Sequence, residues 1–120
     1  MMNDQGSNAQ PALPFAEAVR AGDLLFLSGQ IGVGESNEFG QEVRQVMENI
    51  GRVLQEHTLH YANLVSVSIY LTDMADYAEM NKIYSGFFQG GYPSRVCVTV
   101  KELAMHARIE ISAIASFTSK

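Results

Sequence analysis

The chain has 120 residues, of which 47% are hydrophobic and 18% charged, a composition typical of one compact globular domain. Its formal net charge is −5 and its eight Lys and Arg residues are scattered, which argues against nucleic-acid binding through a basic surface. The single cysteine cannot form an internal disulfide, and no apolar run approaches the ~18 residues of a membrane span. We therefore expect a soluble, cytoplasmic protein with a flexible N-terminal arm over residues 1–13 and one domain over residues 14–120.

The first predicted element is a β-hairpin. Strand-forming residues run over 15–19 and again over 24–28, and residues 21–23 supply a turn between them. Gly29 and Gly32 then end the pairing, and a polar loop follows.

A helix is predicted over residues 41–57. Its apolar residues recur at helical spacing from Val43 to Leu54, so one side of the helix should face the core. Gly51 lies inside this helix and weakens it, because glycine has a poor helix propensity.

Residues 64–71 are predicted to form a strand with two different sides. One side is aliphatic, and the other carries Ser66, Ser68 and Tyr70. A second amphipathic helix is predicted over residues 74–88, and the residues of its apolar, core-facing side are Tyr77, Met80, Tyr84, Phe87 and Phe88.

Two more strands are predicted, over residues 93–100 and 108–117. In the first of them the valines alternate with Arg95 and Cys97, and we expect the valines to face the core beneath the helices. The order of elements is therefore a β-hairpin followed by α, β, α, β and β.

The predicted fold class is α+β, in two layers. Two amphipathic helices separated by strands can cover one face of a four- to six-stranded mixed sheet. The other face would be polar but sparsely charged, which favours packing against further copies of the chain. A monomer with a solvated serine and threonine face is the alternative.

Arg95 and Glu110 are the leading candidates for chemistry. If the valines face the helices, alternation places both charges on the uncovered face of the sheet. They could form an ordinary cross-strand salt bridge, which contributes little to stability. Alternatively, Arg95 offers a planar guanidinium to the carboxylate of a small ligand, while Glu110 holds a water molecule or transfers a proton.

The other reactive side chains support weaker hypotheses. The charge of Arg95 could favour the thiolate of Cys97, but no adjacent histidine supplies a base, so we expect Cys97 to line a pocket. His57 and His60 have a spacing suited to two metal ligands but lack a third, so we expect them to cap the first long helix. Ser28 does not stand in a hydrolase motif, and no metal or organic cofactor is predicted.

Two short motifs carry a resemblance to a known family, namely Pro93-Ser94-Arg95 and Ile109-Glu110-Ile111. Matching segments include 24-LLFLSGQIG-32, 48-ENIGRVL-54 and 65-VSVSIYLTDMADY-77. With these residues the chain resembles the RidA/YjgF family of reactive-intermediate deaminases, whose members are also called L-PSP endoribonucleases or translation inhibitors.

The resemblance implies a chorismate-mutase-like fold assembled as a homotrimer, with clefts at the subunit interfaces. Similar proteins hydrolyse 2-imino acids and their enamine tautomers, such as 2-iminobutanoate and 2-iminopropanoate, to 2-keto acids and ammonia. Carried onto this chain, Arg95 would bind the substrate carboxylate and Glu110 would position the attacking water. The residues that would line or shape the cleft are Phe15, Ser28, Gly29, Asn81 and Cys97.

Three departures from the family pattern bear on substrate range. Phe15 stands where a tyrosine is common, Ser112 replaces a second acid, and residues 104–106 form an altered loop. Imine deamination remains the leading prediction, and a noncatalytic binder of 2-keto acids, in which only Arg95 matters, is the runner-up. A ribonuclease or translation inhibitor is the third possibility, against which the low basic charge counts.

Overall fold

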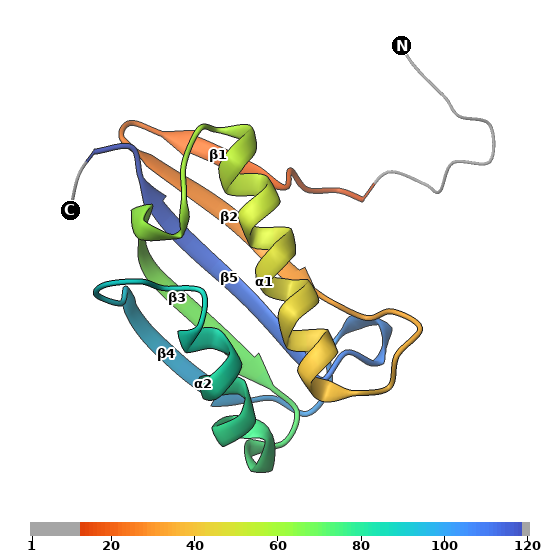
Figure 1. The fold of residues 1–120 in the computed structure, drawn as a ribbon. Helices are drawn as coiled ribbons and strands as arrows, with labels where there is room; N and C mark the ends of the chain where they lie inside the picture. The colour runs from red at the N-terminus through yellow and green to blue at the C-terminus, as the bar shows by residue number, and fades with distance from the viewer. Residues whose placement is uncertain (1–12, 119–120) are drawn as a thin grey trace.

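The computed structural model describes residues 13–118, so that the predicted N-terminal arm lies outside the described residues except for Leu13. Five strands form one sheet in the order β1-β2-β5-β3-β4, and two α-helices cover one face of it (Figure 1). β3 and β4 are parallel and the other neighbouring strands are antiparallel. The predicted α+β fold class is confirmed.

The predicted elements all occur, and all but β3 have shifted bounds. The strands are β1 (Ala18–Ala21), β2 (Leu24–Ile31), β3 (Leu64–Leu71), β4 (Ser94–Thr99) and β5 (Ile109–Ser116). The helices are α1 (Phe39–Glu56) and α2 (Tyr77–Ser85), with short 3-10 turns at Tyr61–Asn63, Met74–Asp76 and Ala104–His106. No helix in residues 13–118 is long and apolar enough to cross a membrane.

Two predicted bounds were wrong in ways that matter for the site. The second helix does not run over residues 74–88, because a 3-10 turn precedes α2 and the helix stops at Ser85. Pairing does not end at Gly29, because β2 continues to Ile31 beyond a register shift between Leu27 and Gln30. Such a β-bulge lets a strand bend without leaving its sheet.

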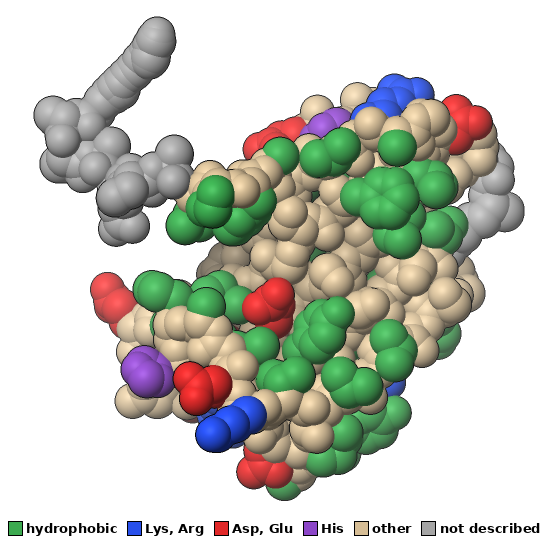
Figure 2. All heavy atoms as spheres, turned by 180° about the vertical axis from the view of Figure 1, so that it is seen from behind, with side chains coloured by type: hydrophobic (Ala, Val, Ile, Leu, Met, Phe, Trp, Pro, Cys, Tyr) green, Lys and Arg blue, Asp and Glu red, His purple; other side chains and the backbone are tan. Residues whose placement is uncertain are grey.

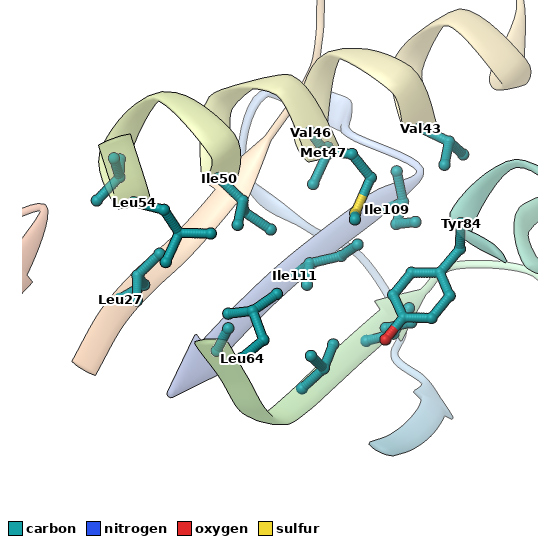
Figure 3. Close-up of a cluster of buried hydrophobic side chains, with 14 of the residues drawn as sticks. Leu27, Val43, Val46, Met47, Ile50, Leu54, Leu64, Tyr84, Ile109 and Ile111 are labelled. Carbon is teal, nitrogen blue, oxygen red and sulfur yellow. The ribbon is translucent and has the colours of Figure 1, made fainter. Parts of the chain in front are cut away.

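The hydrophobic core lies between the two helices and the sheet (Figure 3). The apolar side of α1 supplies Val46 and Ile50, which point toward Leu27 of β2 and Ile111 of β5. The helical spacing of apolar residues in α1 is therefore confirmed, and burial of this side of the helix is what stabilises it.

Packing explains why residue 51 of α1 is a glycine. The Tyr61 hydroxyl donates a hydrogen bond to the Met47 carbonyl at 2.8 Å, and a Cβ on Gly51 would overlap that hydroxyl. The glycine that weakens the helix thus makes room for the 3-10 turn that leads into β3.

The second face of the sheet carries no helix, and hydrophobic and uncharged side chains cover most of it (Figure 2). Ser66, Ser68 and Tyr70 lie on this open face as predicted, since the residues alternating with them in β3 are buried or nearly so. Val96 and Val98 also lie there, with 51% and 41% of their surface exposed.

The prediction that the β4 valines face the core was therefore wrong. Arg95 pairs with Val67 and Cys97 pairs with Ile69 in the parallel β3–β4 ladder, and both β3 residues are buried beneath the helices. Residues paired across two strands share a side, so Arg95 and Cys97 face the helices. Alternation shows which residues of a strand share a side, but not which side faces the core.

Candidate active site

Arg95 lies on β4 and faces α2. Its Nη2 donates a hydrogen bond to the Tyr77 hydroxyl at 3.1 Å. The guanidinium carbon also lies 5.6 Å from the centre of the Tyr77 ring and 5.1 Å from that of Tyr84. Both distances fall within the range of cation–π attraction, so two tyrosines of α2 hold the guanidinium.

A cavity of about 330 Å³ opens beside this guanidinium. The residues that line it are Asn81, Tyr84, Ser85, Tyr92, Pro93 and Arg95. Two other hollows, of about 350 and 520 Å³, meet at His60 and Tyr61 and are lined by none of the predicted site residues. The cavity beside Arg95 is therefore the candidate site, although it is the smallest of the three.

Unsatisfied polar groups mark the same cavity. The buried Oδ1 of Asn81 and the buried hydroxyl of Tyr84 have no hydrogen-bond partner within the described chain. In residues 13–118, Arg95 forms no ion pair with a carboxylate. Buried polar groups are normally paired, so a ligand or ordered water is expected here. We call Asn81, Tyr84 and Arg95 the arginine site.

Cys97 lies on the same side of β4, two residues beyond Arg95. It packs against the core and is not among the residues that line the cavity. Burial raises the pKa of the Cys97 thiol, and the nearby charge of Arg95 offsets only part of this rise. The predicted stabilisation of the thiolate by Arg95 is thus outweighed by burial.

Glu110 lies on the open face of β5, between Ile31 of β2 and Tyr70 of β3. Its carboxylate lies directly over Gly29 in the β-bulge of β2, where any Cβ would overlap it. A side chain at residue 29 would displace this carboxylate, so Gly29 allows Glu110 to occupy its present position.

Ser28 ties the preceding segment to the same bulge. Its hydroxyl donates a hydrogen bond to the Ala16 carbonyl at 2.6 Å, and its backbone N–H donates to the Glu17 carbonyl at 2.9 Å. The backbone next to Phe15 is thereby held close to Gly29, and the Phe15 side chain is 58% exposed. We call Ser28, Gly29 and Glu110 the glutamate site.

The prediction that Arg95 and Glu110 share a face of the sheet was wrong. Arg95 faces α2, whereas Glu110 alternates with the buried Ile109 and Ile111 and points away from the helices. No ion pair joins the two side chains in the described chain, which removes the cross-strand salt bridge as an explanation for them. The predicted site residues therefore form two separate groups.

The histidines near the end of α1 have local partners. His57 is the C-terminal cap of α1, and its Nδ1 lies 3.0 Å from the Val53 carbonyl, so its predicted capping role is confirmed. His60 instead begins the 3-10 turn, where its backbone N–H donates to the Asn63 side chain at 3.0 Å. Across residues 13–118, no three His, Cys, Asp or Glu side chains gather as a metal site requires.

The tyrosines around Arg95 were not predicted from the sequence as site residues. Tyr77 and Tyr84 are seven residues apart and therefore share one side of α2, which the pattern assigned to the core. Their helical spacing indicated that the two tyrosines lie on the same side of the helix. Their contact with Arg95 could not be foreseen, because it depends on which side of β4 faces α2.

A model of the family described as Endoribonuclease L-PSP matches residues 6–117. The chain belongs to this family. A RutC family protein of Sinorhizobium fredii is 35% identical over 111 residues, which cover 88% of each chain. The mouse 2-iminobutanoate/2-iminopropanoate deaminase is 34% identical over 110 residues, covering 85% of this chain and 80% of the mouse protein.

A solved structure extends the family match to three dimensions. The crystal structure of Escherichia coli TdcF with bound serine superposes with a TM-score of 0.85 at 29% identity, and the match covers 90% of this chain and 91% of TdcF. Together with the family model, these relatives confirm the resemblance to RidA/YjgF proteins.

Proposed function

We propose that this protein hydrolyses reactive 2-imino acids and their enamine tautomers, such as 2-iminobutanoate and 2-iminopropanoate, to 2-keto acids and ammonia. The mouse relative is named as a deaminase of these two compounds. The TdcF structure contains bound serine, a small molecule that likewise carries a carboxylate beside an amino-bearing carbon. Removal of such reactive intermediates is the proposed role of the protein in the cytoplasm.

One observation supports this proposal above the others. Arg95 faces a cavity next to the unpaired Oδ1 of Asn81, and no carboxylate of the described chain neutralises it. A planar guanidinium binds a carboxylate through two parallel hydrogen bonds, and the Asn81 oxygen can accept a hydrogen bond from a substrate N–H. The arginine site therefore suits a small acid that bears nitrogen.

The proposal includes a site shared between copies of the chain. Arg95 and Glu110 lie on opposite sides of the sheet, so one substrate can contact both only if they come from different subunits. The open face, with its exposed Val96 and Val98 and few charges, suits burial against another copy. We therefore propose a homotrimer with three clefts, each combining an arginine site and a glutamate site.

The residues of this shared cleft suffice for the reaction. Arg95 holds the carboxylate of the protonated imino acid, whose C2 is already electrophilic. Glu110 takes a proton from the water that adds to C2, which gives a carbinolamine. Glu110 then returns this proton to the nitrogen. As the C–N bond breaks, the hydroxyl oxygen forms the C=O bond, and its proton passes through Glu110 to the departing ammonia. The 2-keto acid and ammonium leave, and no oxidant, reductant or further reactant is consumed.

The experiment generates 2-iminobutanoate in place with a threonine dehydratase and measures its capture by semicarbazide. Wild-type protein should suppress capture by forming 2-ketobutanoate. Arg95→Ala should raise KM about 10- to 100-fold because a charged hydrogen-bonding partner is lost. Glu110→Gln should lower kcat by about 100-fold or more because proton transfer is lost.

Two exposed charges provide matched controls. Arg44→Ala and Glu48→Gln, both on α1, make the same chemical changes at exposed positions outside both sites, and should behave as wild type. If semicarbazide captures 2-iminobutanoate equally with and without wild-type protein, the deaminase proposal for this substrate is wrong. If 2-ketobutanoate still binds in that case, and binding needs Arg95 but not Glu110, the protein is a noncatalytic binder.

A further inference from the structure

We infer that Tyr77 is a positioning residue that holds the Arg95 guanidinium in the orientation needed to bind a substrate carboxylate. This inference rests on the proposed function, because it assigns the substrate carboxylate to Arg95. It concerns the Tyr77 hydroxyl, which accepts the hydrogen bond from Arg95 Nη2 at 3.1 Å.

The hydrogen-bonding capacity of the guanidinium permits this role. Arginine has five N–H donors in one plane, and Tyr77 accepts one of the two on Nη2. One complete edge of the fork, made of two parallel N–H groups, stays available for a carboxylate. The tyrosine can therefore fix the rotation of the guanidinium without competing with the substrate for that edge.

The Tyr77 hydroxyl has a role that the rings of Tyr77 and Tyr84 do not have. Tyr84 is buried, and its ring lies 5.1 Å from the guanidinium carbon, but its hydroxyl makes no hydrogen bond in the described chain. Ring contacts of this kind attract the charge but scarcely restrict its rotation in the plane. The bond to Tyr77 is directional and supplies that restriction.

The backbone of Tyr77 is anchored at the start of α2, although 39% of the surface of this residue is exposed. It is the first residue of α2, directly after Asp76, whose two carboxylate oxygens accept hydrogen bonds from Arg108 Nη2 at 3.0 and 3.2 Å. Asp73 caps the preceding 3-10 turn by accepting from the Ala75 N–H at 2.9 Å. These contacts tie the start of α2 to the segment before β5 and fix the backbone of Tyr77.

The decisive variant is Tyr77→Phe, which removes the hydroxyl and keeps the ring against Arg95. We expect KM for 2-iminobutanoate and Kd for 2-ketobutanoate to rise roughly three- to tenfold with kcat nearly unchanged, as suits one lost hydrogen bond in a partly exposed site. The NMR order parameter of the Arg95 Nε–H bond should fall in the unliganded protein. Thermal unfolding should shift little.

Tyr61→Phe is the matched control. It removes a tyrosine hydroxyl that also makes one hydrogen bond, to the Met47 carbonyl, away from Arg95. It should lower the melting temperature while leaving KM, Kd and the Arg95 order parameter unchanged.

The outcomes separate the two proposals. If wild type is an active deaminase and Tyr77→Phe leaves KM, Kd and the order parameter unchanged, the positioning role is overturned while the proposed function stands. If wild type shows no deaminase activity but binds 2-ketobutanoate, and Tyr77→Phe weakens that binding, the proposed function fails and the positioning role stands. An equal loss of Arg95 order in Tyr61→Phe would overturn the positioning role, because the effect would then be general.

Discussion

Arg95 and Cys97 share one side of β4 but differ in their surroundings. Arg95 reaches the cavity beside α2, whereas Cys97 packs against the core, where burial raises the pKa of its thiol. A thiol with a raised pKa is a poor nucleophile at neutral pH, because the thiolate is the reactive form. Cys97 is therefore a packing residue beside the arginine site.

The raised pKa of the Cys97 thiol predicts how its rate of alkylation depends on pH. Because its pKa is raised in the folded protein, less thiolate is present at a given pH, so iodoacetamide should alkylate folded protein more slowly than urea-unfolded protein at pH 8. The rate should increase as the pH rises. Arg95→Ala should slow the reaction further, because the charge that lowers the pKa is gone. Rapid alkylation of folded protein at pH 7 would contradict the assignment.

The two motif residues illustrate what a sequence reveals at the scale of single residues. Arg95 and Glu110 stood out as isolated charges within apolar strands, and the family motifs pointed to the same pair. Their relative placement could not be predicted, since alternation leaves open which side of β4 faces the helices. The β3–β4 register decides this, and that register is set by contacts between segments far apart in the chain.

At the scale of elements, the sequence was most informative where the pattern was long. β3 has the predicted bounds, and α1 differs from its prediction by two residues at its start and one at its end. α2 was predicted too long because Phe87 and Phe88 continue its apolar pattern. In the structure these two residues lie in the loop after α2, where their rings pack against Tyr61. Aromatic residues with helical spacing can therefore lie outside a helix when tertiary contacts bury them.

The contact between Tyr61 and Gly51 gives a prediction for α1. Gly→Ala in a helix normally stabilises a protein by up to about 1 kcal/mol. Gly51→Ala should instead lower the free energy of unfolding by about 1–2 kcal/mol, because the new methyl group overlaps the Tyr61 hydroxyl. Urea denaturation measures this change.

A double-mutant cycle supplies the control for Gly51→Ala. In a Tyr61→Ala background the overlap is gone, so the same substitution should be neutral or stabilising. An equal loss of stability in both backgrounds would show that Tyr61 is not the cause.

At the scale of the whole molecule, the opposite placement of the two sites determines how inactive variants should complement each other. In a cyclic trimer with shared clefts, a mixed trimer of Arg95→Ala and Glu110→Gln subunits has one cleft with both wild-type residues. Equal amounts of the two variants, mixed by unfolding and refolding together, should therefore recover roughly one quarter of wild-type activity.

The assembly must be measured in the same samples. Light scattering should give the mass of three chains, and subunits carrying different mass tags should confirm that mixing occurred. Each variant refolded alone should stay inactive. Verified mixed trimers without recovered activity would place both residues of a cleft on one chain, and a stable monomer would contradict the shared site altogether.

The arrangement of β3 and β4 also bears on the order of folding. In residues 13–118, β4 pairs only with β3, and a parallel pair can close only after the connecting segment, here α2, has crossed over the sheet. β1, β2, β3 and β5 can pair antiparallel without β4. The strand that carries Arg95 should thus be among the last to join the sheet and the first to detach from it. A partly opened molecule would lose its arginine site while the glutamate site stays intact.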